Sequence, residues 1–204
     1  MTGWMGKGAL PAAALAVVAL TTLQLPASAG SIAAVSELRG TALAGARPES
    51  TAVIWLAAPD APAPATPPRA ELDQRNLAFS PKVLAVRTGT IISFPNNDRV
   101  FHNVFSFRDG KRFDLGTYPV GTVKHLPFDN PGLSRVFCNI HPNMGAYILV
   151  VDSPYFAVTA GDGSFVIAGV PDGSYPYHAW RPSGPDLSGT VVVGGGRRLE
   201  IKWP

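Results

Sequence analysis

Cysteine, methionine and charge are all scarce in this sequence. Of its 204 residues one is Cys and three are Met, and Asp, Glu, Lys and Arg together make up 15%. A single Cys excludes an intramolecular disulfide, and with it the class of small domains that disulfides hold together. The formal net charge of +3 is too small to predict a nucleic-acid-binding surface.

The N-terminal segment is typical of an export signal. Residues 1–29 carry one charge, Lys7, followed by an apolar run rich in Ala, Val and Leu and by small residues up to Ala29. This pattern predicts a signal peptide cleaved after Ala29, and therefore a periplasmic or otherwise exported protein. Pro11 and Gln24 interrupt the apolar run, which falls short of the roughly 20 residues that a membrane span needs. We expect no membrane span in the mature chain; the alternative is a signal retained as an anchor.

The rest of the chain also lacks clear helical periodicity. Short alternating or apolar runs recur between turn residues, and the sequence contains 21 Gly and 20 Pro. Such spacing predicts an all-β sandwich or barrel. The expected strands are 51–56, 82–87, 90–94, 100–107, 134–137, 146–151, 156–159, 164–167, 175–180, 189–193 and 198–202.

Two breaks in composition suggest how these strands are organised. Residues 58–70 are rich in Pro and Ala, which pair poorly in a sheet, and predict an extended linker. A second break lies near residue 152, so that residues 71–152 form one predicted domain. Of the flanks, 30–57 and 153–204, the first offers only two expected strands, too few to be stable alone, and the second offers about five. We predict that they combine into a second small β-sandwich, in which the middle domain is inserted or which follows it.

The only Cys stands in a short run with two other metal-ligand types. Cys138, His141 and Met144 follow one another as C-x2-H-x2-M, in a loop short enough to aim all three side chains at one point. His102 lies at the start of another expected strand and is the candidate for a fourth ligand. The alternative is a buried structural Cys beside a surface His and a core Met.

Two His, one Cys thiolate and a weak axial Met form the ligand set of a blue-copper electron-transfer centre. Thiolate and thioether are soft donors suited to Cu(I), whereas imidazole also suits Cu(II). Coordination would also protect the lone thiol, because a metal-bound Cys is deprotonated and is no longer free to form a disulfide. The sequence therefore predicts one type 1 copper site.

At these residues the chain resembles a cupredoxin of the plastocyanin and amicyanin type. The run "CNIHPNM" is similar to the short amicyanin ligand loop, and "HNV" at 102–104 is similar to the first-ligand motif of plastocyanins. The resemblance covers about residues 76–152. It implies a Greek-key β-sandwich with His102, Cys138, His141 and Met144 as copper ligands.

The resemblance also implies residues that support the ligands. Asn103 would form a hydrogen bond across to the Cys138 loop, as such partners commonly do around metals. Asn139 stands where family members often have Ser or Thr, which changes the other end of that bond. The C-terminal run "GDGSFVIAGVPDGSYPYHAWRP" resembles carboxypeptidase-regulatory-like or transthyretin-like sandwich modules.

Several functions are compatible with these features. The first is a periplasmic one-electron carrier whose redox partner is a cytochrome or a dehydrogenase, with no catalysis of its own. The alternatives are copper delivery or storage, or a cell-envelope scaffolding protein. The sequence contains none of the Met-rich or His-rich tracts expected of a metal carrier, and too few further His for the second copper cluster of an oxidase.

The remaining candidate residues have structural interpretations. His125 and His178 have no neighbours of metal-ligand type. Tryptophans could stack on a sugar, but packing in a sandwich core explains them more simply. Acidic residues occur in expected turns, where Asp accepts local hydrogen bonds. The tryptophans are Trp55, Trp180 and Trp203, and the acidic residues are Asp98, Asp109, Asp114 and Asp129.

Overall fold

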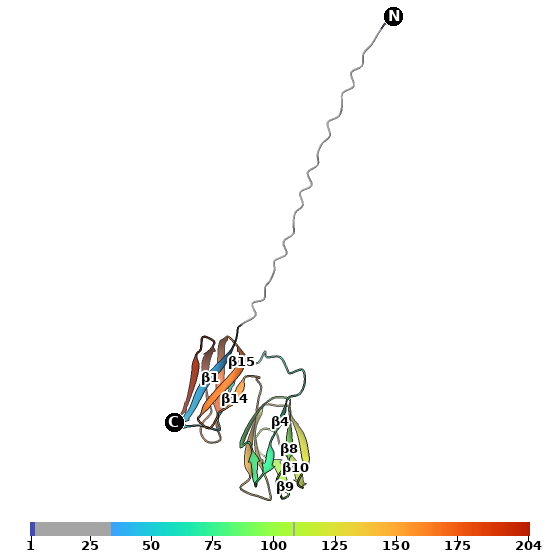
Figure 1. Ribbon diagram of the computed structural model, residues 1–204, viewed down its shortest axis with the longest axis vertical. Coiled ribbons are helices and arrows are strands. Elements are labelled where there is room, and N and C mark those ends of the chain that lie inside the picture. The colour runs from blue at the N-terminus through green and yellow to red at the C-terminus, as the bar shows by residue number, and fades with distance from the viewer. Residues whose placement is uncertain (3–33, 108) are drawn as a thin grey trace. The chain divides into compact units, whose positions relative to one another are not determined.

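The computed structural model describes residues 1–2, 34–107 and 109–204 (Figure 1). These residues form eighteen strands and no helix, which confirms the predicted all-β class. It follows that no helix of the described residues is long and apolar enough to cross a membrane. The predicted export signal over 1–29 lies outside the described residues, apart from its first two positions.

Two sheets enclose the core that carries the candidate ligands. One sheet has the strand order β10-β9-β12-β13-β7 and the other β11-β8-β4, while β5 and β6 form a separate hairpin. Phe94, Val104, Phe128, Val136 and Ile148 pack between the two sheets. The bounds are β4 Arg69–Glu71, β5 Asp73–Arg75, β6 Ala78–Ser80, β7 Val83–Arg87, β8 Thr90–Pro95, β9 His102–Ser106, β10 Phe113–Tyr118, β11 Val123–Phe128, β12 Gly132–Phe137 and β13 Gly145–Val151.

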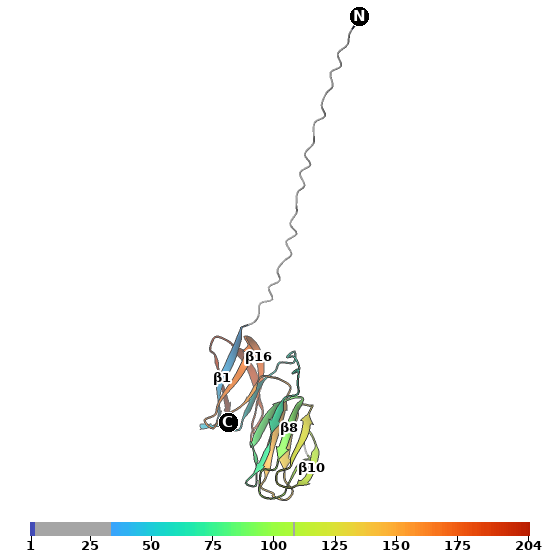
Figure 2. The same ribbon diagram turned by 45° about the vertical axis from the view of Figure 1, so that its right-hand side comes forward.

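Strands from the two ends of the described chain pair with each other. β1 is antiparallel to β15 and parallel to β18, and β3 is antiparallel to β14 and β16. Figures 1 and 2 show this as blue β1 beside orange and red strands. The exact domain bounds 30–57 and 153–204 stay a prediction. The strands are β1 Val35–Ala44, β2 Arg47–Pro48, β3 Val53–Leu56, β14 Phe156–Val158, β15 Ser164–Pro171, β16 Gly173–Trp180, β17 Leu187–Val193 and β18 Arg198–Trp203.

Alternation along β1 explains how these terminal strands share a core. Leu38, Gly40 and Ala42 are buried while their neighbours are partly or fully exposed, as expected for a strand with one face on the core. Gly40 is required there. A Cβ at this position would lie 2.2 Å from the ring of Phe165 and 2.3 Å from the Leu199 carbonyl oxygen.

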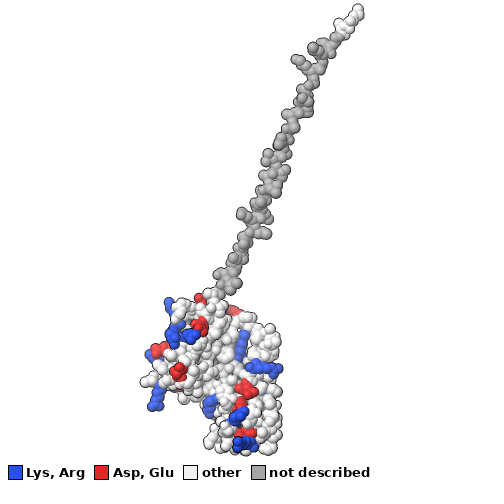
Figure 3. Space-filling view, viewed as in Figure 1, with Lys and Arg blue, Asp and Glu red and all other residues white. Residues whose placement is uncertain are grey.

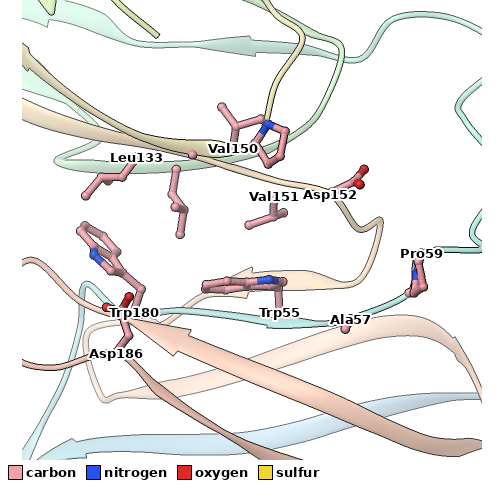
Figure 4. Close-up of a pocket in the computed structure, with 13 residues that line it drawn as sticks. Trp55, Ala57, Pro59, Leu133, Val150, Val151, Asp152, Trp180 and Asp186 are labelled. Carbon is pink, nitrogen blue, oxygen red and sulfur yellow. The ribbon is translucent and has the colours of Figure 1, made fainter. Parts of the chain in front are cut away.

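A third apolar cluster joins β3 and β16 to β7 and β13. Val53 and Trp180 are buried against Val83, Leu149 and Val151. Beside this cluster lies a cleft of about 530 Å³ (Figure 4). Its lining includes the indole rings of Trp55 and Trp180 and the carboxylates of Asp152 and Asp186. The tryptophans thus have packing roles. Trp55 stacks on His178, Trp180 contacts Tyr147, and Trp203 is buried in the core of the terminal strands.

Candidate metal centre

Neighbouring strands bring the candidate ligands to one end of the sheet. His102 begins β9, and Cys138 directly follows β12. β9 and β12 are antiparallel, with Phe105 paired to Phe137, so the start of β9 lies beside the residues that follow β12. The loop between β12 and β13 is closed by two backbone hydrogen bonds. Met144 N–H donates to the His141 carbonyl at 2.9 Å, and Cys138 N–H donates to the Met144 carbonyl at 3.3 Å.

Three donor atoms converge at this end of the sheet. The Nδ1 atoms of His102 and His141 are 3.1 Å apart, and the Cys138 Sγ lies 3.9 Å and 3.7 Å from them. The point equidistant from these three atoms is about 2.1 Å from each, which is close to the length of a metal–imidazole bond. The side chains therefore already stand at metal-binding distances around one common point.

The chemistry of the three donors fits copper. Cys138 supplies a soft sulfur and the two rings supply imidazole nitrogens, a combination that suits both Cu(I) and Cu(II). Cys138 is a free cysteine and is buried, so its thiol is shielded from solvent. Among residues 1–2, 34–107 and 109–204, the donor atoms of His102, Cys138 and His141 lie close enough together to hold a metal ion. These three residues form a candidate copper site.

Met144 lies in the core beside this group. Its side chain is 1% exposed and belongs to the same apolar cluster as Cys138. Its backbone closes the ligand loop, as described above. The structure thus gives Met144 a packing role, and its part as fourth copper ligand stays a prediction.

An acidic residue outside the ligand set contacts the first His. The Nε2 of His102 lies 2.9 Å from Asp98 Oδ2, and both side chains are nearly excluded from solvent. A carboxylate can only accept, so the ring proton must be on Nε2. Nδ1 is then left with its lone pair toward His141 and Cys138, which is the tautomer that a metal requires.

Asp98 is held as an anion by several donors. Burial alone would raise its pKa, but hydrogen bonds from the Leu77 N–H, the His102 ring and the Arg99 N–H outweigh it and lower the pKa to about 2. The sequence interpretation, which assigned Asp98 to local turn bonding, missed this contact. The available signal was its position four residues before His102.

The two residues predicted to support the ligands, Asn103 and Asn139, do not form the predicted contact. Asn103 is buried, but its amide donates to Asp114 Oδ1 at 2.8 Å instead of bonding to the Cys138 loop. Its Oδ1 has no hydrogen-bond partner among the described residues. Asn139 is exposed. The predicted cross-loop hydrogen bond is therefore not formed in the described part of the chain.

The other two His lie apart from this group, as expected. His125 on β11 has its Nδ1 3.0 Å from the Ser93 hydroxyl on β8. His178 on β16 stacks on Trp55, with ring centroids 5.1 Å apart. Neither belongs to the group that could hold a metal.

Comparison with known proteins gave matches among solved structures alone. No protein-family model matches the chain, and no curated protein matches it. A purple cupredoxin from Nitrosopumilus maritimus is 23% identical with a TM-score of 0.37, over 40% of this chain and 99% of that one.

Two further similar structures are named as copper proteins. The reduced Cu(I) form of an amicyanin variant is 18% identical with a TM-score of 0.37, over 50% of this chain and 99% of that one. A Cu-containing nitrite reductase from Thermus scotoductus is 25% identical with a TM-score of 0.41, over 48% of this chain and 25% of that one. The resemblance of the flanking segments to other sandwich modules stays a prediction.

Proposed function

We propose that this protein is an exported type 1 copper protein that carries single electrons between redox partners. The observation that carries the proposal is the convergence of two imidazole nitrogens and one buried thiol sulfur around a single point. Copper, when bound, supplies a one-electron couple between Cu(I) and Cu(II). The donor set serves both states, so little rearrangement of the protein is needed between them.

The candidate ligands differ in how far they are buried. His102 and Cys138 are buried and anchor the centre from inside the sandwich. His141 is partly exposed and offers its ring edge to the surface. Electrons would therefore enter and leave at His141, while the buried ligands keep water and competing thiols away.

The loops that carry the ligands also expose apolar side chains. Val100 and Phe101 directly precede His102, and Ile140 directly precedes His141; all three are exposed. Clustered apolar side chains on a surface commonly mark a contact with another protein. They support docking of a redox protein, a cytochrome or a dehydrogenase, against the end of the sandwich that holds His141.

The proposed role is that of a carrier with a resident copper and without catalysis of its own. On the face shown in Figure 3, Lys and Arg are interspersed with Asp and Glu. Burial of His102 and Cys138 favours a resident metal over one that is handed on. Export by the signal over 1–29 is part of the same proposal.

The absorption spectrum of the copper-loaded protein tests this function. Cu(II) bound to Cys138 should give an intense blue or purple colour that disappears on reduction and returns on oxidation. Cys138→Ser should abolish the colour while leaving the apo fold intact, because Ser is nearly isosteric with Cys. A colourless wild-type copper complex would contradict the proposal.

Matched measurements separate the competing functions. His178→Ala removes an imidazole that is not part of the candidate site and should leave the colour unchanged. Rapid loss of copper to a weak chelator would favour delivery or storage. A Cys138→Ser variant with full activity in the cell would favour a scaffolding role.

A further inference from the structure

The β5–β6 hairpin is attached to the loop that precedes His102. Asn97 N–H donates to the Gln74 carbonyl at 3.0 Å, and the Asn97 amide donates to Asp73 Oδ1 at 2.9 Å. The buried Gln74 side chain donates to the Pro95 carbonyl at 2.9 Å. These contacts fix the hairpin against the β8–β9 loop at both its backbone and its side chains.

The turn of this hairpin has an unusual conformation. Asn76 and Leu77 have φ angles of +53° and +59°, the pair of positive values that a type I′ hairpin turn requires and in which Gly usually occupies the second position. A non-Gly residue with this conformation is strained and persists where the surrounding structure determines it. Leu77 is 52% exposed, so its side chain packing does not explain the conformation.

What the turn does provide is a backbone donor. Leu77 N–H points at Asp98 and donates to its Oδ2 at 2.7 Å. The same oxygen accepts from His102 Nε2 at 2.9 Å, and Oδ1 accepts from the Arg99 N–H at 2.7 Å. Asp98 N–H in turn donates to the side chain of the buried Asn96 at 3.1 Å. Two backbone N–H groups therefore hold the carboxylate, and the Asn96 side chain holds the Asp98 backbone, so that the carboxylate is fixed beside the His102 ring.

We propose that Asp98, held by the Leu77 N–H of the β5–β6 hairpin, is a positioning residue that keeps His102 in its Nε2–H tautomer and sets the copper reduction potential. This inference rests on the proposed copper function only for its effect on the potential. The tautomer is a property of the apo protein, because the Asp98–His102 contact is formed by side chains alone.

The contact has a defined consequence for the metal. A carboxylate that accepts the Nε2 proton increases the electron density at Nδ1, which stabilises Cu(II) more than Cu(I). His141 has no such carboxylate among the described residues, so the two imidazole ligands differ. Loss of Asp98 should therefore weaken Cu(II) binding and make the bound copper easier to reduce.

The first experiment uses the wild-type apo protein and needs no variant. Ring ¹⁵N–¹H correlation spectra should show a single, slowly exchanging proton on Nε2 of His102, since this ring is fully buried. A proton on Nδ1, or a rapidly exchanging mixture of tautomers, would overturn the proposal. Leu77→Gly keeps the N–H donor and should leave the His102 signals unchanged.

The second experiment measures Asp98→Asn loaded with copper. The variant keeps the size of the side chain but lacks the charge and one acceptor oxygen. Its Cu(II) affinity should fall about tenfold, and with Cu(I) affinity unchanged this equals a potential about 59 mV higher. Asp129→Asn removes the same charge from an exposed position and should match the wild type. Equal potentials in both variants would contradict a positioning role for Asp98.

The two experiments distinguish failure of this inference from failure of the proposed function. Absence of any coloured copper complex in the wild type would contradict the proposed function and leave the tautomer result standing.

Discussion

At the scale of single residues, the candidate centre depends on side chains that serve two purposes. Cys138 and Met144 are both core residues and predicted ligands, and their burial alone does not separate these roles. The identities of the donors could be predicted from sequence because Cys, His and Met are chemically distinctive. The role of Asp98 could not, because an Asp in a turn has many local acceptor roles and only its contact with His102 distinguishes this one.

Met144→Leu separates the two roles of the residue. Leu has a similar volume and no sulfur, so the apo protein should lose less than about 1.5 kcal/mol of its free energy of unfolding. If Met144 is the axial ligand, the copper reduction potential and the colour should both change. Unchanged copper properties with unchanged stability would show that Met144 only packs in the core.

At the scale of elements, the ligand loop was predictable and the strands around it were less so. The expected ranges missed several strands, among them β4, β5, β6, β10 and β11. Gly116 within β10 and Pro127 within β11 interrupt the apolar pattern, but both strands pair along an edge of their sheets, where such residues are tolerated. Arg69 and Ala70, expected in the Pro-rich linker, pair with β8, because the last Pro of that segment is Pro68.

The β8–β9 loop depends on one buried amide. Asn96 donates to the carbonyls of Val100 at 2.9 Å and Tyr118 at 3.1 Å, and it accepts from the Asp98 N–H. Asn96→Ala would leave these groups without partners and should lower the free energy of unfolding by about 2–3 kcal/mol, measured by chemical denaturation. Asn97→Ala, which changes an exposed side chain in the same loop, should cost less than about 1 kcal/mol. Equal losses in the two variants would contradict this account of the loop.

At the scale of the whole molecule, side-chain contacts as well as strand pairs join distant parts of the sequence. Glu49 lies before β3 and Arg181 follows β16, and their side chains form an ion pair of 3.1 Å that is largely shielded from solvent. Burial raises the pKa of Glu49, but hydrogen bonds from the Thr51 hydroxyl and N–H and from Arg181 outweigh it and lower the pKa. The ionised form of Glu49 therefore stabilises the fold.

Glu49→Gln tests this long-range contact. At neutral pH the variant should be about 1–3 kcal/mol less stable, because Arg181 loses its charged partner. Since the pKa of Glu49 is lower in the folded state, its contribution is complete above the ordinary value of 4.5 and is lost as the pH falls through the folded value. The difference in unfolding free energy between variant and wild type should therefore shrink in acid.

Glu37→Gln is the matched control, because it alters an exposed ion pair with Arg39. It should change stability by less than about 1 kcal/mol at any pH. A difference for Glu49→Gln that does not depend on pH would contradict the assignment.

The sequence by itself determined the all-β class, through short runs separated by turn residues, and the candidate ligands, through the rarity and spacing of Cys138, His141 and Met144. Local patterns carry this information because strand alternation and ligand chemistry depend on neighbouring residues. Only the tertiary structure decided that the Nδ1 atoms of His102 and His141 lie 3.1 Å apart, that Asp98 contacts the His102 ring, and that β1 pairs with β15 and β18. Most of these contacts join residues that are far apart in the chain. The contact of Asp98 is one of several that an Asp in a turn could form. In both cases the packing of the folded chain decides which contact is made.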